Sequence, residues 1–290
     1  MFGQPETPRL LLAGSVSLGL CTLLLLAGGA EPGQHAFLLT PQFALWVLAV
    51  GLTVAVSSAA LGVSLRDLSK LRPHARKYWP GIVASSLLFA LLVLVPHVHL
   101  ATRSPLAFHG LKVGAVSAFV GLTSFSAVLG LFCVDAAARS FSPEPANAAR
   151  SIEDYLELRS RAERLLRIAG TVIGLATIAR GLLRSALVSV KYDTTNLERE
   201  DILLYGLYLS LILAVSYYPV YASLVAAARR ITSQQPMPDP ASEEFGQWWQ
   251  RQKQLNELLQ LHGDVMGTFG KAVAVAAPLM GALFGLAFEN

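Results

Sequence analysis

The chain has 290 residues, of which 53% are hydrophobic and only 14% are charged, and its mean hydropathy is +0.51. These values exclude an ordinary soluble globular protein and favour helices that cross a lipid bilayer. The net charge is +4, but the 23 basic residues are spread among connectors with 19 acidic residues and form no dense tract, which argues against nucleic-acid binding.

Long apolar stretches follow one another along most of the chain. A helix needs about 20 apolar residues to cross a hydrocarbon layer of about 30 Å, because its backbone polar groups must be satisfied within the segment. The sequence therefore predicts an all-α, polytopic bundle of six or seven transmembrane helices. The predicted spans are 10–28, 43–65, 80–100, 110–133, 168–190 and 202–228, with 266–288 as either a seventh span or a segment that re-enters one leaflet.

The first span has a second interpretation. Arg9, the apolar run 10–27 and the small residues 28–30 also describe a secretory signal peptide. The run is longer than the apolar region of about 7 to 15 residues that is usual in such peptides. This length favours an uncleaved first helix.

The charged connectors predict the orientation of the spans. The connector 66–77 carries five basic residues and one acid, and short connectors of this kind stay in the cytoplasm. The connector 29–42 and the one around Ser104 are nearly uncharged, and 191–201 is acidic, so these three are predicted to be outside. The N-terminus is then cytoplasmic. Arginine outnumbers lysine by 17 to 6, which is typical of a GC-rich bacterium and indicates a bacterial inner membrane.

Two polar segments keep a helical periodicity and are predicted to be amphipathic cytoplasmic helices. The first begins at Ser151 and runs directly into the fifth span. The second follows the proline-rich linker 236–240, with Ser242 as its N-cap. Its apolar face includes Trp248 and Trp249, which suit either the membrane interface or packing on the first cytoplasmic helix.

These assignments divide the chain into five parts. The predicted parts are a four-span bundle (1–134), a cytoplasmic linker and helix (135–167), the fifth and sixth spans (168–230), a second cytoplasmic linker and helix (231–264) and a C-terminal hydrophobic segment (265–290).

Two arginines are the most unusual residues of the predicted spans. Arg180 and Arg184 lie one helical turn apart in the fifth span and project from the same face. Arg180 is about 20 Å along the helix from Arg167, at about 1.5 Å per residue, and so lies deep in the span. The pair is interpreted either as a contact for an anion or acidic lipid, or as a snorkelling pair that anchors the end of the helix.

Small residues recur along the C-terminal hydrophobic segment. Such residues let two helices approach closely, either within one chain or between copies around a pore. The residues of this candidate helix-packing or pore face are Gly270, Ala274, Ala277, Gly281 and Gly285.

The sequence contains no catalytic or nucleotide-binding signature. A P-loop, a GxSxG motif, a kinase motif set and a dinucleotide fingerprint are all lacking. His35, His97, His99 and His109 fall on the predicted outer side, but their spacing matches no zinc motif. No enzymatic activity, cofactor or metal site is therefore predicted.

These features lead to three functional hypotheses. The preferred one is a homo-oligomer that forms a pore or perturbs the membrane, with the lipid bilayer and other copies of the chain as its partners. One alternative is a small-anion or solute transporter that uses Arg180. The other is a membrane anchor or sensor subunit for a soluble cytoplasmic partner.

Overall fold

A computed structural model describes residues 14, 16–17, 20, 40–75, 78–101, 109–144, 147–190, 198–234, 238, 244–259 and 265–287. The first predicted span, with its signal-peptide alternative, lies almost wholly outside these residues. Ser242, His35 and most of the linker 236–240 also lie outside them, as do the side chains of His97, His99 and His109.

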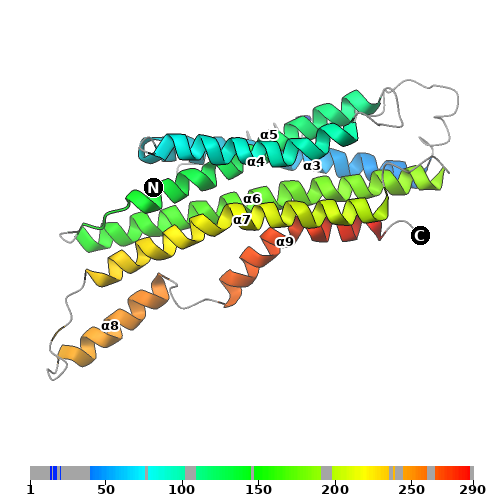
Figure 1. Cartoon of the computed structure of the whole chain (residues 1–290). Coiled ribbons are helices and arrows are strands. Elements are labelled where there is room, and N and C mark those ends of the chain that lie inside the picture. Colours follow the sequence, from blue (N-terminus) through cyan, green and yellow to red (C-terminus); the bar gives the residue numbers. More distant parts are fainter. Residues whose placement is uncertain are drawn as a thin grey trace.

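The regular structure of the described residues is helical throughout, which confirms the all-α prediction for this part of the chain. Within it, seven helices follow one another from residue 40 onward (Figure 1). They are α3 (Pro41–Ala75), α4 (Trp79–Ala101), α5 (His109–Ser140), α6 (Ala148–Ser189), α7 (Arg199–Ser233), α8 (Glu244–Leu258) and α9 (Val265–Leu286).

Four of these helices, α3, α5, α6 and α7, are long and apolar enough to cross a membrane. The described apolar parts of α4 and α9 are shorter, at Trp79–Leu91 and Gly270–Leu286. The four long helices have 32 to 42 residues each, well above the length of about 20 that one crossing needs. They therefore continue as helices beyond their apolar parts.

Two of the long helices, α3 and α5, extend past the predicted ends of their spans, so these predicted boundaries were wrong. The connector that follows the second predicted span is helical as far as Ala75, and α5 continues to Ser140 instead of ending near residue 133. The first predicted cytoplasmic helix and the fifth span form the single helix α6, which agrees with the predicted continuity. The apolar half of α6 begins at residue 168, after a half rich in charge.

The start of α6 lies three residues before the predicted one, and the cap is a different residue. The side-chain oxygen of Asn147 accepts a hydrogen bond from the backbone N–H of Arg150, so Asn147 satisfies one of the free donors of the first turn. Ser151 caps the preceding loop instead, because its hydroxyl accepts the N–H of Glu144 at 2.9 Å.

The surface of the bundle carries many apolar side chains, whereas several hydroxyl side chains are buried inside it. Leu204, Leu207, Leu211 and Val215 line one face of α7 and expose between 52% and 66% of their surface. Fully or almost fully buried polar residues include Thr53, Ser57 and Ser64 on α3, Thr123, Ser124 and Ser126 on α5, and Thr177 on α6. Water would favour the reverse arrangement, so this pattern fits a membrane-embedded protein.

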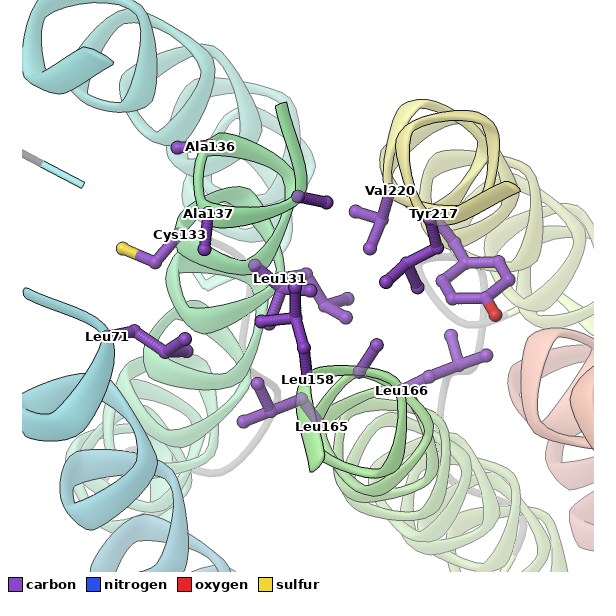
Figure 2. Close-up of a cluster of buried hydrophobic side chains, with 14 of the residues drawn as sticks. Leu71, Leu131, Cys133, Ala136, Ala137, Leu158, Leu165, Leu166, Tyr217 and Val220 are labelled. Atoms are coloured by element: carbon purple, nitrogen blue, oxygen red, sulfur yellow. The ribbon is translucent and has the colours of Figure 1, made fainter. Parts of the chain in front are cut away.

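The largest apolar core joins α5, α6 and α7, and much of it lies in the half of α6 that carries the charges. Figure 2 shows side chains from α5 and α7 meeting Leu158, Leu165 and Leu166 of α6. Leu131 of α5 and Val220 of α7 are likewise buried in this cluster. The helices thus remain tightly packed beyond the apolar part of α6.

Candidate functional site

Helices α6, α7 and α9 meet along a common line, which we call the seam. The interface between α6 and α9 is the most extensive of any two helices in the described part of the chain. Its residues are Gly170, Gly174, Thr177 and Gly181 of α6, Gly206 and Ser210 of α7, and Ala274, Ala277, Pro278, Gly281 and Gly285 of α9. Along α6, the residues Gly170, Gly174 and Gly181 lie against Ala274, Ala277 and Gly285 in the same order, so α9 runs parallel to α6. Along α7 the order is reversed, with Gly206 against Ala282 and Ser210 bonded to Leu279, so α9 runs antiparallel to α7.

Glycines bring the backbones of α6 and α9 into direct contact. A Cβ atom placed on Gly181 would lie 2.7 Å from the carbonyl carbon of Gly285, closer than carbon atoms can approach. A Cβ on Gly281 would likewise meet the backbone of Gly174. Gly270, near the start of α9, faces open space. Small residues are therefore required in the seam but not at the first position of the predicted small face.

Pro278 interrupts the hydrogen bonding of α9 inside the seam. Figure 1 shows that α9 bends along its length, and proline causes such bends because it lacks an N–H group. The hydroxyl of Thr177 donates to the carbonyl of Pro278 at 2.9 Å. The N–H of Leu279 donates to the Ser210 hydroxyl at 3.1 Å. Side chains of α6 and α7 thus form hydrogen bonds to backbone groups of α9 at Pro278 and at the residue after it.

An ion cluster closes the end of the seam where α9 begins. The Glu163 carboxylate accepts hydrogen bonds from Arg159 on its own helix and from Lys271 on α9, both at 3.1 Å. Arg159 also donates to the carbonyl of Leu259, the residue after α8, at 2.8 Å. Partial burial alone would raise the pKa of Glu163, but the two cations outweigh it and hold this pKa below its ordinary value.

Arg180 lies at the opposite end of the seam. Its guanidinium carbon is 4.7 Å from the centroid of the Tyr205 ring, a cation–π contact between α6 and α7. Its Nε atom is buried and has no hydrogen-bond partner among the described residues. Asp201, one turn before Tyr205, contributes to the electrostatic environment of the guanidinium. Arg184, one turn further along α6, makes an interaction of its own.

The predicted small face of α9 is divided between the seam and the surface. Ala274, Gly281 and Gly285 are buried against α6, and Ala277 is partly buried there, whereas Gly270 is exposed. This face is therefore occupied by the protein's own helices over most of its length.

The predicted interfacial tryptophans lie on α8, away from the seam. Trp248 and Trp249 stack with Phe245, with ring centroids 5.7 and 6.4 Å from that of Phe245. Trp249 is exposed, whereas the other end of α8 is anchored by buried Leu255 and Leu259. The helix thus presents an aromatic cluster at its free end.

Sequence reasoning did not find the bidentate ion pair between Asp67 and Arg164. The Arg164 Nε and Nη2 atoms donate to the two carboxylate oxygens at 2.8 and 3.2 Å. Asp67 was interpreted only as the acid of a basic connector, and no local pattern connects it to a residue 97 positions away. Its place on the buried stripe of α3, three residues after Ser64, is the one available signal.

Among the described residues, no group of three or more His, Cys, Asp or Glu side chains could hold a metal ion. Comparisons with known protein families, curated proteins and solved structures gave no match to this chain.

Proposed function

We propose that this chain is a non-enzymatic integral protein of a bacterial inner membrane that anchors or senses for a soluble cytoplasmic partner. The observation that carries the proposal is the packed bundle of α5, α6 and α7 beyond the apolar half of α6, together with the aromatic cluster of α8, of which Trp249 is exposed. A helix that served only to cross the bilayer would not need the charged residues 148–167 that precede the apolar half of α6.

The proposed topology has seven spans with a cytoplasmic N-terminus. The four long apolar helices are joined by the first predicted span, by α4 and by α9. Since α9 runs parallel to α6 and lies beside it from Gly170 to Gly181, it follows α6 through most of the apolar layer. The basic connector after the second span lies in the cytoplasm on this topology, as do the charged half of α6 and helix α8.

The pore hypothesis receives less support from the arrangement of α9. A pore lined by the small face of α9 would require this helix to leave α6 and α7. It would then give up the contacts at Gly281 and Gly285 and the hydrogen bonds around Pro278. The transporter alternative remains compatible with the structure, because Arg180 lies partly buried between α6 and α7.

Purification from native membranes in mild detergent tests the anchor proposal. We expect a soluble protein to co-purify at fixed stoichiometry with the full chain. Replacement of 242–262 by a glycine–serine linker of equal length should release it, while membrane insertion is unchanged. Trp249→Ala should weaken the association, and Trp79→Ala is the matched control, because Trp79 is also an exposed tryptophan but lies on α4.

Two results would count against the proposal. In one, no protein co-purifies at fixed stoichiometry. In the other, the linker variant retains the partner as well as the wild type does. A particle mass equal to several copies of the chain in lipid would then favour the homo-oligomer.

A further inference from the structure

Arg180 carries a charge that no carboxylate in the described part of the chain neutralises through an ion pair. Within the described residues its guanidinium makes a cation–π contact with the Tyr205 ring, at 4.7 Å. The buried Nε–H group of Arg180 has no acceptor among the described residues. Buried polar groups are nearly always hydrogen-bonded, so the charged side chain of Arg180 calls for a partner that lies beyond these residues.

The outer surface of the bundle is apolar around Arg180. Leu204 and Leu207 flank Tyr205 on α7, and both expose more than half of their surface. A charge at this level is costly unless it faces a partner, because lipid tails offer no hydrogen bonds. Asp201 acts on the guanidinium only through space.

The guanidinium group identifies the class of partner. Its two Nη groups form a planar fork that matches two oxygens of a planar or tetrahedral oxyanion. Nε is shielded by the protein, but the Arg180 side chain as a whole is only partly buried, so the Nη edge is the one that a ligand can reach. A chloride ion or a neutral solute would not use the fork in this way.

We propose that Arg180 binds a phosphate-type oxyanion through its Nη groups, between α6 and α7. The oxyanion is either the headgroup of an anionic phospholipid or free phosphate. Tyr205 lies six residues into α7, about 9 Å from the start of the helix, so that a lipid phosphate at the membrane interface can approach it.

The test compares the purified full-length wild type with Arg180→Gln, Arg180→Lys and Arg184→Gln. Arg184→Gln is the matched control, because it removes the same charge one turn away on the same helix. In the first arm, nanodiscs of zwitterionic lipid with a minor fraction of phosphatidylglycerol are dissolved in detergent, and the phosphatidylglycerol retained per chain is measured by mass spectrometry. In the second arm, radiolabelled inorganic phosphate is equilibrated with protein free of anionic lipid.

We expect the wild type and Arg184→Gln to retain phosphatidylglycerol, and Arg180→Gln to retain it about ten- to a hundredfold less tightly. Arg180→Lys should fall between them, since lysine keeps the charge but lacks the fork. Binding in the phosphate arm alone would identify the free anion as the ligand and keep the site.

The proposal is overturned if neither probe binds the wild type better than Arg180→Gln, or if Arg184→Gln loses as much binding as Arg180→Gln. Thermal unfolding of each variant shows whether it is folded. Should Arg180→Gln fail to fold, the lysine variant decides, because equal retention by Arg180→Lys and the wild type would contradict bidentate binding.

Discussion

At the scale of single residues, the two glycines Gly281 and Gly270 give a matched test of the seam. Both lie within α9, so replacement by alanine changes the helix propensity equally. Gly281→Ala places a Cβ against the backbone of Gly174 and should lower the free energy of unfolding by about 1 to 3 kcal/mol. Gly270→Ala meets open space and should raise it by about 0.5 to 1 kcal/mol. Thermal unfolding in detergent measures both, and equal destabilisation would contradict the packing of α9.

The sequence predicts single residues only where the signal lies within one helix. The depth of Arg180 follows from counting along the predicted span, and the close spacing of small residues follows from the same periodicity. The contact of Arg180 with Tyr205 depends on how α6 and α7 are aligned, which periodicity does not determine. The Asp67–Arg164 pair is hidden for the same reason.

At the scale of elements, the ion cluster around Glu163 ties α9 to α6 and should make their association sensitive to pH. The pKa of Glu163 is held below its ordinary value of 4.5, so its stabilising contribution is complete above that value and is lost as the pH falls through the folded-state pKa. At neutral pH, Glu163→Gln should therefore unfold at a lower temperature than the wild type.

Measurement at low pH is the control for this prediction. The unfolding temperatures of Glu163→Gln and the wild type should converge as the pH falls below about 4.5, because the wild-type carboxylate is then protonated. The measurement is tryptophan fluorescence in a detergent that does not titrate in this range. A difference that stays constant down to low pH would assign the effect of the substitution to packing instead of charge.

The positions of the helices were predictable, but the charged ends of the longest ones were not. An apolar run marks the part of a helix that lipid surrounds, and α4 and α9 nearly coincide with their predicted spans for this reason. The charged extensions of α3, α5 and α6 are held by contacts between helices, such as those of Leu165 and Leu166, and so leave no simple mark on hydropathy. Ser151 was assigned as a cap by pattern, although Asn147 performs that role.

At the scale of the whole molecule, the direction of α9 connects the fold to the sidedness of the protein. The predicted order of charges places the start of α6 in the cytoplasm. Because α9 is parallel to α6 and is fixed to it at both ends of the seam, its C-terminal end must emerge on the same side as the C-terminal end of α6. On the proposed topology, this arrangement predicts seven spans and an outer C-terminus.

A reporter that fluoresces only in the cytosol tests this topology. Fused after residue 290 it should be dark, and inserted into the linker between α7 and α8 it should be bright, because that linker follows the sixth span. An outer-side reporter at the same two positions should give the opposite signals. If the C-terminal fusion is bright in the cytosol, α9 does not cross the bilayer. The parallel packing of α9 on α6 would then have to break before insertion, and the seam could not exist within the membrane as described.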